Sequence, residues 1–189
     1  MSKFLDSYFI DFKRVLDDFL TTGQNVALLN EAVLMLEATR TTKKTIYLVG
    51  NGGSSAIAEH MAIDLTKNAG LRATAISGSP MLTTFSNDYG YERVFQKPIE
   101  IFGNEGDILI AISSSGSSVN ILNACEAAKG RGMKIITFSA FKSDNPLRRK
   151  GDLNFWVDSK AFGYVELIHN VLIHYINDSI IGKAEYMIR

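Results

Sequence analysis

The sequence predicts a doubly wound α/β fold, with a mostly parallel sheet of five strands and two leading helices. Three observations predict it. From residue 45 onward, short β-rich apolar runs alternate with helical segments, an order typical of βαβ units. The runs are continuously apolar, as strands buried on both faces of a parallel sheet are. Two of them end in turns that are rich in glycine or serine.

The two leading helices are indicated by apolar residues that recur at helical spacing. The first set is Phe4, Tyr8, Phe9, Phe12, Leu16, Phe19 and Leu20. The second set is Val26, Leu29, Ala32, Val33 and Leu36. Gly23 separates the two sets, and both precede any strand. These helices could therefore cap the sheet or pack against another subunit.

The alternating region supplies the five expected strands and three expected helices. The strands are predicted at residues 45–49, 73–76, 107–112, 134–138 and 153–157. The helices are predicted at residues 54–67, 117–131 and 162–181. No linker, low-complexity tract or repeat interrupts this pattern, which favours one domain over residues 1–189.

Composition limits the classes of function. The 189 residues are 46% hydrophobic and 21% charged, as in globular proteins rather than disordered chains. Lysine and arginine number 20, as do aspartate and glutamate, so net charge gives no reason to expect nucleic acid or a membrane as a partner. Cys125 has no partner for a disulfide. Without a signal peptide or an apolar run of about 18 residues, a cytoplasmic location is expected.

The first chemically unusual turn follows the first predicted strand. It reads Gly50-Asn51-Gly52-Gly53-Ser54-Ser55 and leads into a helix. Glycines let the backbone approach a ligand closely, and a helix N-terminus presents free N–H groups to an anion. The simpler interpretation is a tight turn with Ser54 as the helix cap. Glycine at three of four positions favours a ligand.

The second such turn follows the third predicted strand. It reads Ser113-Ser114-Ser115-Gly116-Ser117-Ser118. Its five hydroxyls are neutral hydrogen-bond donors, which suit a phosphate group that must be released after turnover. In open α/β sheets ligands bind beyond the carboxyl ends of the strands, so both turns can contact one anion. Neither turn carries the lysine of a P-loop.

Further short motifs accompany these turns. They are Ala58-Glu59-His60 with Asp64-Leu65, Asn87-Asp88-Tyr89-Gly90-Tyr91 with Val94-Phe95, Gly106-Asp107 before the serine turn, and His169 and His174 near the C-terminus. Together with the turns they resemble the SIS (sugar isomerase) domain family. Within it they are similar to the sedoheptulose 7-phosphate isomerases, also called phosphoheptose isomerases. The resemblance spans nearly the whole chain.

The resemblance implies roles for the loop residues and an assembly. Phosphate contacts would come from Ser54, Ser113, Ser115 and Ser118. Substrate contacts would also come from Asn51, Gly52, Gly53, Ser114 and Asp88. The resemblance further implies an SIS-type sheet and a homotetramer with active sites at subunit interfaces, in which residues 1–42 help assembly. It implies a zinc ion, one per active site, at the reacting end of the sugar.

A candidate acid–base and metal cluster comes from two helices. His60 and Asp64 share one face of the first crossover helix, and Glu166, Asn170 and His174 form a stripe on the last. If the helices meet, His60, Asp64, Glu166 and His174 could hold zinc or a similar ion. Either Asp64 or Glu166 could be the base, with His174 as its acid–base partner. An isolated pair of this kind would more often be structural, and His169, off the stripe, is expected to be structural.

The expected activity is aldose–ketose isomerisation through an enediol. The resemblance implies conversion of sedoheptulose 7-phosphate to D-glycero-D-manno-heptose 7-phosphate for cell-surface heptose synthesis. In the family the cluster usually holds His, Glu, Gln and His, and an acidic residue usually occupies the position of Gly78. Asp64, Glu166 and Gly78 depart from that pattern, so an isomerase of another sugar phosphate stays open. A non-catalytic SIS protein that binds sugar phosphates or a replication initiator is the other alternative.

Overall fold

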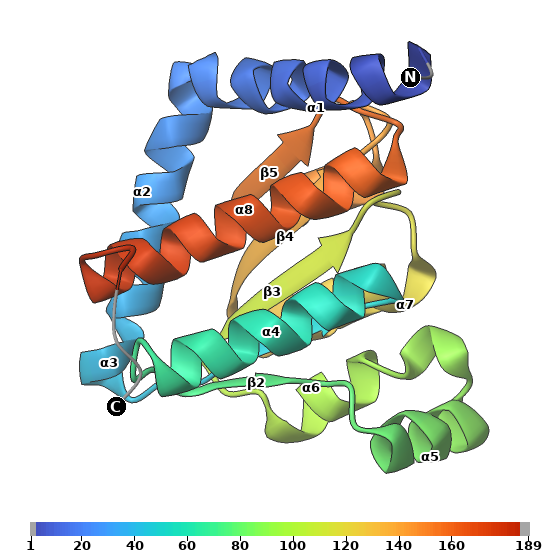
Figure 1. Cartoon of the computed structure of the whole chain (residues 1–189). Coiled ribbons are helices and arrows are strands. Elements are labelled where there is room, and N and C mark those ends of the chain that lie inside the picture. The colour runs from blue at the N-terminus through green and yellow to red at the C-terminus, as the bar shows by residue number, and fades with distance from the viewer. Residues whose placement is uncertain (1–2, 186–189) are drawn as a thin grey trace.

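The computed structural model describes residues 3–185 of the chain, and an open parallel sheet lies at its centre (Figure 1). The strands are β1 (Ile46–Gly50), β2 (Ala73–Ala75), β3 (Ile108–Ser113), β4 (Lys134–Ala140) and β5 (Leu153–Val157). Their order is β2-β1-β3-β4-β5, and each neighbouring pair is parallel. The doubly wound α/β prediction is therefore confirmed.

Helices cover both faces of the sheet. The helices are α1 (Lys3–Thr21), α2 (Gly23–Glu37), α3 (Thr39–Thr42), α4 (Gly53–Lys67), α5 (Ser79–Tyr89), α6 (Gln96–Phe102), α7 (Val119–Gly130) and α8 (Phe162–Ile181). Two short 3-10 turns, η1 (Tyr91–Arg93) and η2 (Pro146–Arg149), complete the described elements. In Figure 1, α4 and α8 lie side by side in front of the sheet, whereas α6 and α7 lie behind it.

Two apolar clusters follow from this layering. The central strands are fully buried, so their side chains alternate between the two faces. Ile46, Leu48 and Ile110 pack with α2, α4 and α8. Tyr47 and Val49 pack with α6 and α7 on the other face. Burial on both faces explains why these strands read as continuous apolar runs.

The strand order places a crevice between β1 and β3. From β1 the chain crosses to β2 on one side, and β3 then lies on the other side of β1. Such a reversal is a topological switch point, where the loops after the two strands diverge and leave room for a ligand. The loops in question are the glycine turn after β1 and the serine turn after β3.

Several details differ from the sequence prediction. The third strand begins one residue later than expected and includes Ser113, which pairs with Ser139 of β4. Asp107, expected in the strand, instead accepts hydrogen bonds from the backbone amides of Thr45 and Asn104. The helix predicted from residue 117 begins at Val119, after the serine turn. Elements α3, α5, α6, η1 and η2 were not predicted.

Candidate active site

The glycine turn and the serine turn face one cavity of about 260 Å³ at the switch point. Its lining residues are Asn51, Ser54, Ile112, Ser113, Ser114, Ser115, Ser118, Phe162 and Glu166. Six of these nine are residues that the sequence assigned to substrate binding. The structure therefore brings together two turns that lie about 60 positions apart in the chain.

The serine hydroxyls form a compact set of donors. Ser113 Oγ donates to Ser118 Oγ at 3.2 Å and lies 3.5 Å from Ser115 Oγ. Ser113 and Ser114 are only 6% exposed. Gly116 takes a positive φ of 62°, which lets the turn reverse before α7 begins at Val119. A cavity lined by hydroxyls between the N-termini of α4 and α7 suits an anion such as phosphate.

A second group of polar side chains lies where α4 meets α8. Asp64 Oδ2 is 3.3 Å from His60 Nε2 and 3.7 Å from His174 Nδ1. The two imidazole rings are 4.9 Å apart between centroids and nearly perpendicular. Ligand atoms of all three residues lie within 4.8 Å of one another. Bonds of about 2.0–2.2 Å from a tetrahedral ion separate its ligands by about 3.3–3.6 Å, so the two imidazoles and the carboxylate fit zinc.

Glu166 links this cluster to the hydroxyl-lined cavity but is not a member of it. Among residues 3–185, the group with metal-ligand spacing contains His60, Asp64 and His174 only. Glu166 lies over the first turn of α4, where a Cβ on Gly53 would be 2.5 Å from its Oε1. It lines both the serine cavity and a second cavity of about 400 Å³ that includes His60 and Asn170. The two cavities thus adjoin at Glu166.

Asn51 is held by two residues that the sequence analysis did not identify. Its side chain exchanges two hydrogen bonds with Asn120 of α7, at 2.9 and 3.0 Å. Its Oδ1 also accepts from the hydroxyl of Tyr91 at 2.9 Å. Tyr91 stood in a quoted motif, but nothing in its neighbourhood indicates a partner 40 positions away.

Asp88 and His169 lie outside these cavities. Asp88 is on the exposed helix α5, where its Oδ1 accepts from Asn87, and its substrate role stays a prediction. His169 is fully buried beside Phe138, with Nε2 3.3 Å from the carbonyl of Ser139. Burial lowers its pKa from 6.5 to about 4. His169 is neutral at physiological pH and belongs to the core.

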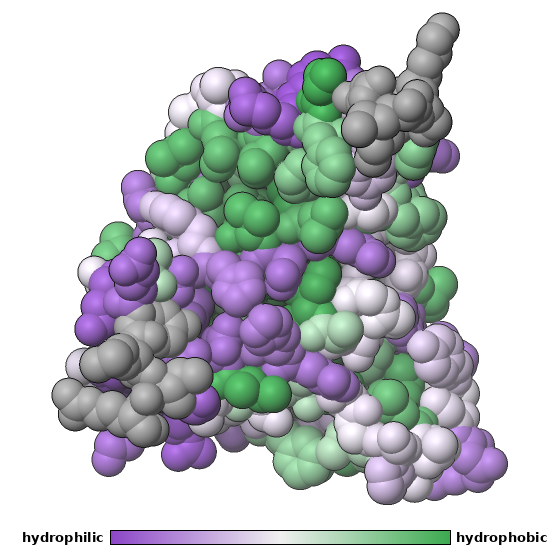
Figure 2. All heavy atoms as spheres, in the orientation of Figure 1, coloured by the Kyte–Doolittle hydropathy of each residue, from purple (hydrophilic) through white to green (hydrophobic). Residues whose placement is uncertain are grey.

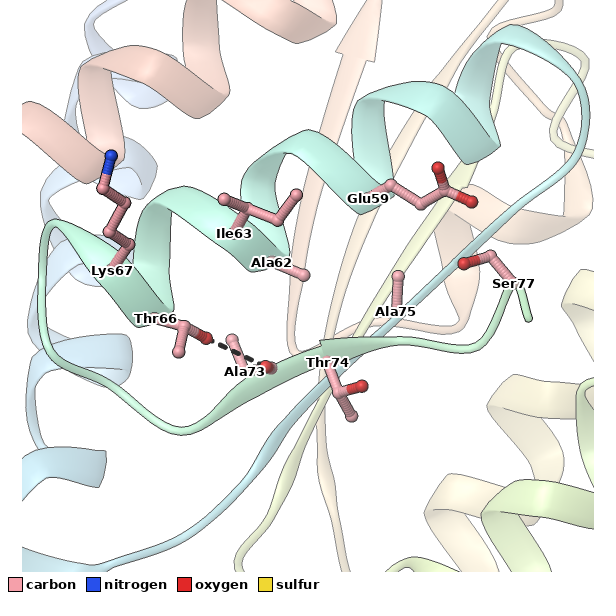
Figure 3. Close-up of a pocket in the computed structure, with 9 residues that line it drawn as sticks. All are labelled: Glu59, Ala62, Ile63, Thr66, Lys67, Ala73, Thr74, Ala75 and Ser77. Atoms are coloured by element: carbon pink, nitrogen blue, oxygen red, sulfur yellow. Dashed lines mark hydrogen bonds between the residues drawn. The ribbon is translucent and has the colours of Figure 1, made fainter.

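Another groove, of about 480 Å³, lies between α4 and the sheet edge at β2 (Figure 3). Its lining residues are Glu59, Ala62, Ile63, Thr66, Lys67, Ala73, Thr74, Ala75 and Ser77. Thr66 Oγ1 donates to the carbonyl of Ala73 across it, at 3.0 Å. None of the predicted site residues lines this groove, although it has the larger volume. The predicted site residues that line a cavity do so at the two smaller ones.

Comparison with known proteins matches this arrangement. The profile of the SIS domain family matches residues 7–140. A phosphoheptose isomerase from Histophilus somni is 37% identical over 166 residues, which are 85% of each chain. The structure of phosphoheptose isomerase GmhA from Neisseria gonorrhoeae aligns with a TM-score of 0.86 and 29% identity, over 93% of this chain and 96% of that one. A phosphoheptose isomerase from Francisella tularensis aligns with a TM-score of 0.88 and 27% identity, over 97% and 100%.

Proposed function

Because this chain belongs to the SIS domain family, and within it to the phosphoheptose isomerases, we propose that it isomerises sedoheptulose 7-phosphate to D-glycero-D-manno-heptose 7-phosphate. One observation carries the proposal. The hydroxyl-lined cavity and the His60–Asp64–His174 cluster lie on either side of Glu166. An anion site beside a group of acids and bases is what an isomerase of a sugar phosphate requires.

The phosphate would occupy the serine cavity. Ser54, Ser113, Ser115 and Ser118 line it, and their hydroxyls donate without adding positive charge. The free amides at the N-termini of α4 and α7 add partial positive charge. Gly52 and Gly53 leave the backbone open to the ligand, and the positive φ of Gly52 forms the turn. Such a site binds the phosphate and leaves the sugar chain free to extend past Glu166.

The reaction moves one proton between neighbouring carbons. A base removes a proton from C1 of the ketose, which gives an enediolate, and the proton returns to C2 as the carbonyl moves to C1. We assign the base role to Glu166, which borders both cavities. His174 would transfer the proton between the two oxygens through Nε2, the ring nitrogen other than the one that faces Asp64. Asp64, which lies between two imidazoles, is better placed as a ligand than as a base.

The cluster fits a zinc ion held by His60, Asp64 and His174, because the two imidazole–carboxylate distances, 3.3 and 3.7 Å, are close to the ligand separations around tetrahedral zinc. Such an ion, when bound, would polarise the carbonyl and stabilise negative charge on the enediolate. Glu166 would then complete the site as base rather than as a fourth ligand. Two variants separate these roles. Asp64→Asn should lose bound metal, whereas Glu166→Gln should keep it and lose exchange of the C1 proton with solvent deuterium.

The direct test of the function is an isomerase assay with His174→Ala. Turnover of sedoheptulose 7-phosphate should fall by at least about 100-fold, because an acid–base group of this kind contributes roughly 10²–10⁴-fold. Inhibition by inorganic phosphate should stay unchanged, because the serine cavity does not include His174. Tyr175→Phe is the matched control on the same helix, because the hydroxyl that it removes makes one long hydrogen bond of 3.4 Å, to Asn30 Oδ1. Unchanged turnover in His174→Ala would remove the proposed role.

Because Gly78 departs from the family pattern, the activity should be tested on several sugar phosphates rather than on one. It precedes α5, and a Cβ there would meet nothing within 4 Å. The family usually carries an acidic side chain at this position. Gly78 lacks that side chain, and no neighbouring group fills the space. An assay should compare heptulose and pentulose phosphates. A pentulose phosphate with a higher kcat/KM than sedoheptulose 7-phosphate would reassign the substrate while keeping the chemistry.

We also propose a homotetramer located in the cytoplasm. Apolar side chains gather over the region between α1 and α8 (Figure 2). The exposed large apolar residues on these two helices are Phe4, Phe9, Ile10, Leu20, Phe162, Leu167, Val171 and Tyr175. A patch of this kind marks an interaction surface, and it adjoins the cavity lined by Leu167 and Glu166. Light scattering should give four copies. None of the helices in residues 3–185 is long and apolar enough to cross a membrane.

A further inference from the structure

Two asparagine side chains join the loops that form the substrate cavity. Asn51 follows β1, and Asn120 lies in the first turn of α7. Each amide donates to the oxygen of the other, at 3.0 and 2.9 Å. Asn120 is only 3% exposed, whereas Asn51 is partly exposed. Asn51 also lines the cavity that holds the predicted phosphate site.

The direction of each hydrogen bond in this group is fixed by one backbone amide. The N–H of Ile121 can only donate, and it is shared between the carbonyl of Ser118 at 3.1 Å and Asn120 Oδ1 at 3.0 Å. The oxygen of Asn120 therefore faces that amide, and its nitrogen faces Asn51. Asn51 must in turn present its oxygen to Asn120 Nδ2. The hydroxyl of Tyr91, 2.9 Å from the same oxygen, then has to donate to it.

A count of donors and acceptors shows what is left for a ligand. An asparagine side chain has two acceptor sites on its oxygen and two hydrogens on its nitrogen. Tyr91 and Asn120 fill both acceptor sites of Asn51, and Asn120 takes one hydrogen. In the described part of the chain, the other hydrogen of Asn51 Nδ2 has no protein acceptor. Asn51 can therefore offer a donor to the cavity and nothing else.

We propose that Tyr91 and Asn120 are positioning residues that fix Asn51 as a one-way N–H donor to a substrate oxygen. The inference rests on the proposed function and deepens it. Without the Tyr91 bond, the oxygen of Asn51 keeps one free acceptor site, which a sugar hydroxyl could occupy. With both acceptor sites filled, only the donor is left for the substrate. The oxygen that Asn51 contacts is therefore an acceptor, such as the carbonyl or the oxygen that gains charge in the enediolate.

Tyr91, which fills the second acceptor site of Asn51, is not among the residues that line the cavity. It opens η1, directly after α5, and its side chain is 59% exposed. The segment is attached to α7 by a second bond, from Asn123 Nδ2 to the carbonyl of Glu92 at 2.9 Å. The hydroxyl of Tyr91 is thus held beside Asn51 by contacts that do not involve the ligand. Removing that hydroxyl should leave the fold intact.

The test is a double-mutant cycle on the full-length protein. Tyr91→Phe should lower kcat/KM for sedoheptulose 7-phosphate by roughly 3- to 10-fold, as expected for one hydrogen bond. Inhibition by inorganic phosphate should not change. In an Asn51→Ala background the same substitution should have no further effect, because Tyr91 acts only through Asn51. Tyr89→Phe, an identical change two positions away, should match the wild type.

The outcomes separate this inference from the proposed function. An unchanged kcat/KM in Tyr91→Phe, or an equal loss in the Asn51→Ala background, would overturn the positioning role in an active isomerase. A wild type that binds sedoheptulose 7-phosphate without converting it would contradict the proposed function alone. The same double-mutant cycle, measured on dissociation constants for this sugar phosphate, would then test the positioning role. A wild type that neither converts nor binds that sugar phosphate would overturn both.

Discussion

Replacing Gly50 with alanine should lower the stability of the protein and disrupt the proposed anion site. Gly50 ends β1, where the chain turns sharply into the glycine loop. A Cβ there would lie 2.5 Å from the carbonyl carbon of Ser54 and 2.8 Å from the nitrogen of Ser55. These are backbone atoms in the first turn of α4, so no side-chain rotation can relieve the contact.

The size of the effect follows from that geometry. The first turn of α4 would have to withdraw by about 1 Å to restore an ordinary contact. Overpacking usually costs about 1–3 kcal/mol, and a rigid neighbour places the cost near the upper end, at about 3 kcal/mol. Because Ser54 moves with the turn, one wall of the phosphate cavity moves too. We therefore expect weaker phosphate binding as well as lower stability.

Urea unfolding at fixed protein concentration, followed by circular dichroism, measures the first effect. Stabilisation by added inorganic phosphate measures the second. Gly23→Ala is the matched control, because a Cβ at this helical position would meet nothing within 4 Å. It should stabilise the protein by about 0.5–1 kcal/mol. A Gly50→Ala protein as stable as the wild type, with unchanged phosphate stabilisation, would refute the reasoning.

Three other residues give independent predictions. Burial lowers the pKa of His169 to about 4, so the unfolded chain takes up a proton first as the pH falls. As the pH falls from about 6.5 to about 4, this group should lower the free energy of unfolding of the wild type by up to about 1.4 kcal/mol per pH unit. In urea unfolding at several pH values, His169→Gln should show a weaker dependence of that free energy on pH. Burial raises the pKa of the Cys125 thiol to about 12, so a thiol reagent at pH 8 should label it only after unfolding. Labelling of the folded protein at the unfolded rate would contradict its burial. Asn145 is buried and donates to the carbonyls of Ala140 and Lys142, so Asn145→Ala should lower the free energy of unfolding by about 2–3 kcal/mol, and a loss below about 0.5 kcal/mol would contradict these bonds.

The sheet and its ligand-facing turns were predictable because burial on two faces leaves a strong pattern. A strand such as β3, with every residue buried, must be apolar along its length. The serine turn stands out because a plain turn needs few hydroxyls. The grouping of His60, Asp64 and His174 needed one assumption beyond spacing, that α4 and α8 meet, and the structure places the two helices together.

The segment between β2 and β3 was not predictable in the same way. Helix α5 has no fully buried residue, and Met81, Leu82 and Phe85 pack against the core only in part, so its apolar pattern is short. The bond from Tyr91 to Asn51 joins positions that only the tertiary fold brings together. The position of Glu166 against Gly53 likewise depends on how α8 crosses α4. The spacing of residues along α8 showed that Glu166 shares a helix face with His174. It could not show that Glu166 lies apart from the cluster of His60, Asp64 and His174.

The position of Glu166 beside the proposed anion site has a consequence for how fast the product leaves. Gly53 has no side chain, and this lets the carboxylate of Glu166 approach the start of α4. The N-termini of α4 and α7 would then attract a bound phosphate ester, while the carboxylate of Glu166 would repel it. If the phosphate binds in the serine cavity as proposed, this balance should shorten the lifetime of the complex in both directions of the reaction. A bulkier residue at position 53 would push the carboxylate away and let the ester stay longer.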